Sequence, residues 1–115
     1  LTGRPHLAHG IGGLSGKAIK PIGVRAVYEL YDELNIPIIG CGGILNGKDA
    51  IEYFMAGASA VEIGSAVYYR EIDVFKKICN EIKEWMRNNN IKNINQIIGV
   101  ANKWIIQELK KLKKL

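Results

Sequence analysis

The sequence predicts an α/β fold, and specifically an incomplete (β/α)8 TIM barrel, from three observations. Two short apolar strands, at 36–40 and 60–63, flank one predicted helix, as in a parallel strand-helix-strand unit. Glycine clusters follow both strands, where such units bind ligands. The 115 residues are 48% hydrophobic, whereas a complete barrel takes about 250 residues. Two parallel strands cannot close a sheet, so we expect the C-terminal portion of a barrel, and the start at Leu1 rather than methionine agrees with this expectation.

The first third of the chain predicts a loop and then a helix. Residues 1–20 are rich in glycine and show no sustained period, which is typical of a long loop. Pro21 is suited to the first turn of a helix, which we expect to end near Asn35. Its apolar stripe repeats at i, i+3, i+4 and i+7 and consists of Val27, Leu30, Tyr31 and Leu34.

The middle of the chain predicts the strand-helix-strand unit. The run at 36–40 is wholly apolar, as in a strand buried on both faces, with Pro37 at its beginning. Asn46 is expected to cap the next helix and Gly57 to end it. The second strand, 60–63, follows at once, and the connection between two such parallel strands is right-handed in nearly all proteins.

The last half of the chain predicts helices. We expect a short helical segment after Gly64 and a long helix over 73–88, broken by three asparagines at 88–90. A further helical stretch is interrupted near Gly99, and an amphipathic helix is expected from 103 to the end. Trp85 and Trp104 fall on apolar stripes, which favours the core for both.

Composition and charge narrow the class of protein. No apolar run approaches the length of a membrane span and no secretory signal is visible, so we expect a cytoplasmic chain. The two cysteines belong to no Cys-x-x-Cys pair or Cys/His cluster, so no metal site is predicted. The net charge of +5 arises entirely after residue 90. We therefore divide the chain into a barrel portion, 1–102, and a basic helix, 103–115, whose alternation with leucines favours packing over nucleic-acid binding.

Three glycine clusters indicate a phosphate site. They lie at 12–16, 40–44 and 63–66, each leading into a predicted helix. The first N–H groups of a helix have no intrahelical partner, and glycine lets an anion approach that backbone closely. Three such clusters in successive units therefore indicate one shared anionic ligand.

The same motifs resemble a known family. Gly-Gly-Leu-Ser-Gly at 12–16 with Ala-Ile-Lys-Pro at 18–21, Ile-Pro-Ile-Ile-Gly at 36–40 with Gly-Gly-Ile at 42–44, Ala-Gly-Ala-Ser-Ala-Val at 56–61, and Ile-Gly-Ser-Ala at 63–66 occur in this order. In order and spacing they resemble dihydroorotate dehydrogenase of the class 1B type. The resemblance covers roughly residues 4–102, and it is specific because several motifs occur in register.

The resemblance implies a flavin mononucleotide (FMN) cofactor in a (β/α)8 barrel that oxidises dihydroorotate to orotate in pyrimidine (UMP) biosynthesis. It implies that Gly16 contacts the flavin and that two pairs bind its phosphate, Gly42 with Gly43 and Gly64 with Ser65. Serine keeps the hydroxyl where the family often has threonine. Barrels frequently bind phosphate after strands 7 and 8, so we expect the two strands to be these.

The resemblance assigns no catalytic residue to this chain. The family's catalytic cysteine lies on a loop well upstream of the first glycine cluster, so we expect the isolated chain to be inactive as a dehydrogenase. Cys41 is in the phosphate loop instead and is interpreted as a small buried hydrophobe. Lys20 matches a family motif position, but a solvated lysine at a helix start is an equally good interpretation.

Partners and alternatives follow from the same resemblance. Class 1B enzymes imply a homodimer and a second subunit that carries an iron-sulfur cluster and FAD. One alternative is another FMN barrel, such as a dihydropyrimidine dehydrogenase, which shares part of the motif set. The other is a non-catalytic, truncated module that binds phosphate or a partner.

Overall fold

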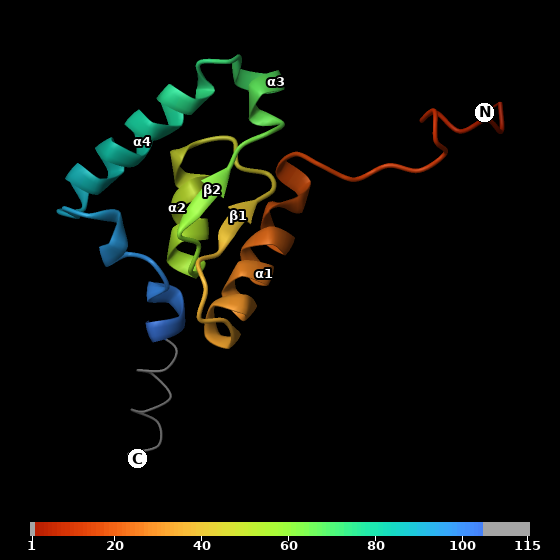
Figure 1. Cartoon of the computed structure of the whole chain (residues 1–115). Coiled ribbons are helices and arrows are strands. Elements are labelled where there is room, and N and C mark those ends of the chain that lie inside the picture. Colours follow the sequence, from red (N-terminus) through yellow and green to blue (C-terminus); the bar gives the residue numbers. More distant parts are fainter. Residues whose placement is uncertain (1, 105–115) are drawn as a thin grey trace.

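The computed structural model describes residues 2–104 and has the expected α/β architecture (Figure 1). In chain order the elements are η1 (Lys17–Ile19), α1 (Lys20–Glu33), β1 (Ile39–Cys41), α2 (Gly47–Ala56), β2 (Ala60–Glu62), α3 (Ala66–Arg70), α4 (Val74–Asn88) and η2 (Ile94–Gln96). Residues 100–104 are helical as well. The two strands pair in parallel, which confirms the predicted strand-helix-strand unit.

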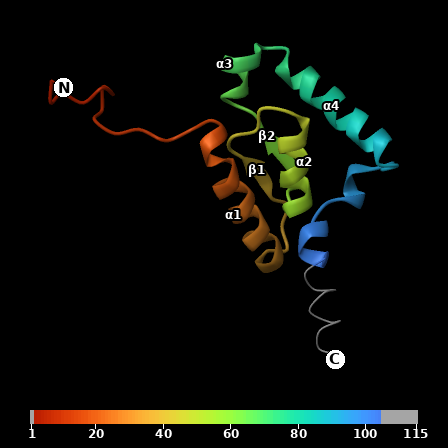
Figure 2. The ribbon, with the colours of Figure 1, turned by 180° about the vertical axis from the view of Figure 1, so that it is seen from behind.

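The parallel sheet places the carboxyl ends of both strands, and the glycine-rich loops that follow them, side by side. Its register pairs Ile39 with Ala60 and Cys41 with Glu62, so β1 and β2 end side by side. Helices α1 and α2 lie against the sheet, and α4 packs across α2 (Figures 1 and 2). The loops after the two strands therefore open at the same end of the molecule, next to the start of α1.

Local sequence signals explain where α2 begins and ends. Asn46 has extended backbone, and its side-chain oxygen accepts a hydrogen bond from the amide of Asp49, as predicted for an N-cap. Gly57 ends the helix with φ of 127°, and its amide donates to the carbonyls of Tyr53 and Phe54. Residues with side chains rarely adopt such a φ, so glycine is suited to this stop.

The core lies between the helices and one face of the sheet. Its most completely buried large apolar side chains are Tyr53 of α2 and Val74 and Ile78 of α4. Ile44, in the loop after β1, is 2% exposed and joins the same cluster. The loop that carries the predicted phosphate-binding glycines is thus continuous with the core.

Two expectations about burial are wrong. The strands are not buried on both faces: Gly40 is buried against α2, whereas Ile39 is 58% exposed. Successive residues of a strand point to opposite faces, and within residues 2–104 helices cover only the face of Gly40. Trp104 is 63% exposed and so lies outside the core. Trp85 is partly buried and packs against the core, as predicted.

The ends of the described chain differ. Residues 2–15 form no helix or strand and are exposed, which confirms the predicted loop, and Figure 1 shows them running away from the body. Most of the helix predicted over 103–115 lies outside the described residues. Within residues 2–104, no helix is both long and apolar enough to cross a membrane.

We predict that Ile78→Ala lowers the free energy of unfolding by about 2–4 kcal/mol, because it leaves a cavity in the α2–α4 contact. Ile22→Ala is the matched control, since Ile22 is 68% exposed, and we expect a change of about 0.5 kcal/mol or less. Urea unfolding followed by circular dichroism measures both. Equal losses in the two variants would contradict the described core.

Candidate functional site

All five residues predicted to bind the cofactor line one cavity of about 280 Å³. It lies between three segments: the loop before η1, the loop after β1 and the loop after β2. Its lining consists of Leu14, Ser15, Gly16, Ile19, Cys41, Gly42, Gly43, Ile44, Glu62, Gly64 and Ser65. The three glycine clusters, far apart in sequence, therefore meet at one site.

Gly43 is the point at which two of these segments touch. Its φ is 68°, and a Cβ atom there would lie 2.8 Å from the carbonyl oxygen of Gly16 and from the backbone nitrogen of Lys20. No side chain fits between these backbones. Glycine at position 43 thus lets the loop after β1 lie directly on the segment that opens α1.

The cavity offers hydrogen-bond donors rather than cations. Among the described residues, the amides of Gly43 and Ser65 donate to no acceptor, and the Ser65 hydroxyl makes no capping bond to α3. The lining contains no lysine or arginine, and Glu62 is its one carboxylate. An anion held here would therefore be bound by backbone N–H groups and a hydroxyl, which is how glycine-rich loops bind phosphate.

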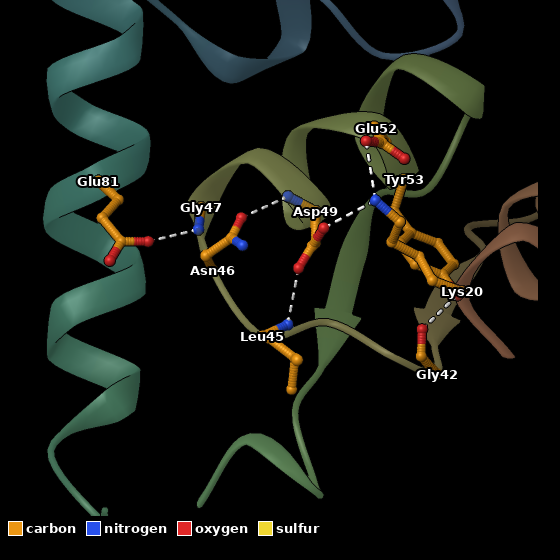
Figure 3. A network of polar contacts seen from close by, with 9 residues as sticks. All are labelled: Lys20, Gly42, Leu45, Asn46, Gly47, Asp49, Glu52, Tyr53 and Glu81. Carbon is orange, nitrogen blue, oxygen red and sulfur yellow. Dashed lines mark hydrogen bonds and ion pairs between the residues drawn. The ribbon is translucent and has the colours of Figure 1, made fainter. Parts of the chain in front are cut away.

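The hydroxyl of Tyr53, on α2, forms hydrogen bonds to the backbone of the loop after β1 (Figure 3). The hydroxyl oxygen lies 2.7 Å from the carbonyl oxygen of Gly42 and 3.2 Å from that of Cys41. Burial raises the pKa of the Tyr53 phenol, with the nearby Cys41 as the next cause. The hydroxyl is therefore protonated at neutral pH and can act as a hydrogen-bond donor to the loop carbonyls.

Lys20 forms ion pairs with two carboxylates of α2, one of which also binds the loop after β1 (Figure 3). The ammonium of Lys20 lies 2.7 Å from Asp49 Oδ1 and 2.9 Å from Glu52 Oε1. The second oxygen of Asp49 accepts the amide of Leu45 at 3.0 Å. Burial alone lowers the pKa of Lys20, but the hydrogen bonds to Asp49 and Glu52 outweigh burial and raise it. Lys20 is therefore an ion-paired residue at the loop rather than a solvated one.

Helices α3 and α4 contribute a third set of contacts. The Arg70 guanidinium donates to the carbonyl of Leu45 at 2.8 Å and to Glu81 Oε1 at 2.6 Å. The other oxygen of Glu81 accepts the amide of Gly47 at 2.6 Å, at the start of α2. Its hydrogen bond to Arg70 is the main cause that lowers the pKa of Glu81, although partial burial opposes it.

Sequence reasoning missed Tyr53 and the three acidic side chains of this supporting network, Asp49, Glu52 and Glu81. Asp49, Glu52 and Tyr53 are spaced i, i+3 and i+4 on α2, which places them on one helix face. That spacing was the available signal, but nothing in the sequence shows that this face meets Lys20. Cys41 was misjudged: it is exposed, because Gly40 faces the helices and its neighbours point the other way.

A larger cavity lies elsewhere and holds none of the predicted residues. Its volume is about 490 Å³, and it lies between the start of α2 and the second half of α4. Asn46, Lys48, Glu81, Glu84, Trp85 and Asn88 line it. Within residues 2–104, no cluster of three or more metal-binding side chains is present.

Comparison with known proteins identifies the family. The family model for dihydroorotate dehydrogenase matches residues 2–86. The chain belongs to the dihydroorotate dehydrogenase family. It is 56% identical over 99 residues to the dihydroorotate dehydrogenase B (NAD(+)) catalytic subunit of Methanocaldococcus jannaschii, and 51% identical over 100 residues to that of Pyrococcus horikoshii. These relatives confirm the predicted resemblance to the class 1B type.

The match covers most of this chain but only part of each relative. It takes in 86% of the chain and 32% of the Methanocaldococcus protein, so the chain spans about a third of the length of the relatives it matches. The solved structure of DHODH from Eimeria tenella in complex with ferulenol is similar, with a TM-score of 0.76 and 34% identity. That similarity covers 82% of this chain and 26% of the Eimeria chain.

We predict that the Glu81 contacts make stability depend on acid pH. Because the pKa of Glu81 is lowered in the folded state, its contribution is fully present above the unfolded value of about 4.3 and is lost as pH falls through the lower folded value. Glu81→Gln should be less stable than the wild type at pH 7 by about 0.5–1 kcal/mol, a small value since the pair is partly exposed.

Thermal unfolding between pH 7 and pH 2.5 measures this effect. The wild type and Glu81→Gln should converge at the acid end of the range. Glu84→Gln, an exposed position on the same helix, is the control and should follow the wild type throughout. A constant difference between wild type and Glu81→Gln at every pH would contradict the assignment.

Proposed function

We propose that this chain supplies the FMN phosphate-binding part of a dihydroorotate dehydrogenase, the enzyme that oxidises dihydroorotate to orotate in pyrimidine biosynthesis. One observation carries the proposal. Gly16, Gly42, Gly43, Gly64 and Ser65 come from three separate segments and line a single cavity. The names of the relatives favour this enzyme over a dihydropyrimidine dehydrogenase.

The cavity fits the chemistry of a phosphate ester. Such a group carries nearly two negative charges and several acceptor oxygens, which N–H groups fixed in space satisfy well. The free amides of Gly43 and Ser65 and the Ser65 hydroxyl are such donors. Gly43 and Gly64 carry no side chain of their own, so neither residue blocks the approach of an anion to its backbone.

The position in the fold supports the same proposal. We infer that β1 and β2 correspond to strands 7 and 8 of a TIM barrel, since phosphate sites of such barrels frequently follow these strands. The exposed face of the sheet carries Ile39, Cys41, Ala60 and Glu62. In a complete barrel this face is the one that points to the interior.

The chain's own residues position the cofactor rather than react. FMN, when bound, supplies the hydride acceptor for the oxidation. Gly42 with Gly43 and Gly64 with Ser65 would hold its phosphate, and Gly16 would contact the flavin. We assign no described residue to proton transfer. For the whole protein we propose, in addition, that it binds dihydroorotate, forms a homodimer and works with an electron-transfer subunit that carries an iron-sulfur cluster and FAD. We expect the isolated chain to be inactive as a dehydrogenase.

Flavin titration with a paired glycine test checks the proposal. The fluorescence of FMN is followed as the chain is added, and saturable binding is expected. A Cβ atom at Gly64 would meet nothing within 4 Å, so Gly64→Ala should fold normally. Its methyl group would nevertheless crowd a phosphate at this backbone, and we expect FMN affinity to fall about tenfold or more, or about 1.4 kcal/mol.

Gly13→Ala is the matched control. A Cβ atom at Gly13 also meets nothing within 4 Å, but Gly13 does not line the cavity, so FMN affinity should be unchanged. No saturable FMN binding by the wild type, or equal affinities of the wild type and Gly64→Ala, would overturn the proposed site.

A further inference from the structure

We propose that Tyr53 is a positioning residue for the cofactor phosphate: it orients the peptide between Gly42 and Gly43 so that the Gly43 N–H points into the cavity. This inference rests on the proposed function and names a residue outside the cavity lining. Tyr53 does not contact the cavity itself. It acts through the backbone of the loop after β1.

The geometry of a trans peptide carries the argument. In such a unit the C=O of one residue and the N–H of the next point in opposite directions. Tyr53 has one hydroxyl hydrogen, and the shorter of its two contacts, 2.7 Å, is to the carbonyl oxygen of Gly42. This bond holds the Gly42 carbonyl toward α2 and so turns the Gly43 N–H away from α2. That N–H has no acceptor among the described residues.

Close packing prevents the Tyr53 ring from moving. The side chain is 0% exposed, and two glycines make room for it. A Cβ atom at Gly40 of β1 would overlap the ring, and a Cβ atom at Gly23 of α1 would overlap the hydroxyl. Glycine inside a helix costs about 1 kcal/mol relative to alanine, so α1 sacrifices stability at position 23 where the Tyr53 hydroxyl needs space.

Independent contacts hold the peptide on its other sides. Gly43 lies against the backbone of Gly16 and Lys20, and Asp49 accepts the amide of Leu45 two residues further on. Without the Tyr53 bond, however, Gly42 is free to turn its carbonyl, since glycine has access to most backbone conformations. A peptide that is free to turn presents the Gly43 N–H to the phosphate only part of the time, which weakens binding.

The test compares two flavins that differ only in the phosphate. We expect the wild-type chain to bind FMN more tightly than riboflavin, and the ratio of the two affinities to fall about tenfold in Tyr53→Phe, as for one hydrogen bond to a charged group. Riboflavin affinity should not change. Isothermal titration calorimetry measures both, and circular dichroism confirms that the phenyl ring is accommodated.

Two further variants separate positioning from general stability. Tyr31→Phe is the matched control: its ring packs on Gly57 and Gly99, away from the cavity, so the ratio should match the wild type. p-Aminophenylalanine at position 53 restores a donor at the same place. It should recover most of the preference for FMN, and it also tests the proposal if Tyr53→Phe fails to fold.

The outcomes distinguish this inference from the proposed function. If the wild type binds FMN no better than riboflavin, the proposed phosphate site fails and the role of Tyr53 with it. If the wild type prefers FMN and Tyr53→Phe keeps the full preference, the site stands and the role of Tyr53 is refuted. Equal loss of affinity for both flavins in Tyr53→Phe would also refute it, because a purely structural role predicts that result.

Discussion

The contact of the Tyr53 side chain with the loop after β1 is the interaction on which the site depends. The ring is buried where α1, β1 and α2 meet, and each neighbouring element has a glycine at the point of closest approach, Gly23 and Gly40. Its hydroxyl forms hydrogen bonds to the carbonyls of Cys41 and Gly42. The core of the molecule and the conformation of the candidate phosphate loop are therefore set by the same side chain, and disturbing one disturbs the other.

Charge is arranged around the cavity rather than inside it. Two positive residues beside the loop, Lys20 and Arg70, are paired with Asp49, Glu52 and Glu81, and neither lines the cavity. In the proposed function, anion binding would be left to backbone amides, whose directions are fixed by the fold and which lose no side-chain entropy on binding. Electrostatic pairing thus contributes to the shape of the site, and under the proposed function the peptide dipoles would supply its affinity for an anion.

The sequence predicted those features that depend on local signals. The Asn46 cap, the Gly57 stop and the strand-helix-strand unit follow from residues a few positions apart. The five residues predicted to bind the cofactor line one cavity together with residues that the sequence did not single out. Pairings across the fold were missed, because the contact of Lys20 with Asp49 joins residues 29 positions apart on two helices. The exposure of Cys41 was missed because an apolar run does not show which face of a strand is covered. The proposal that the ligand is FMN rests on the resemblance to the dihydroorotate dehydrogenase family and not on the residues alone.

Amide chemical shifts measured while FMN is added to the ¹⁵N-labelled chain would show whether the glycine-rich loops bind the phosphate, because they report on each backbone N–H separately. We expect the amide signals of Gly43, Gly64 and Ser65 to shift most, with the same saturation curve. The amide signals of residues beside the larger cavity, such as Glu84 and Asn88, should stay unchanged. Shifts concentrated at the α2–α4 cavity, or spread evenly over the chain, would contradict phosphate binding at these loops.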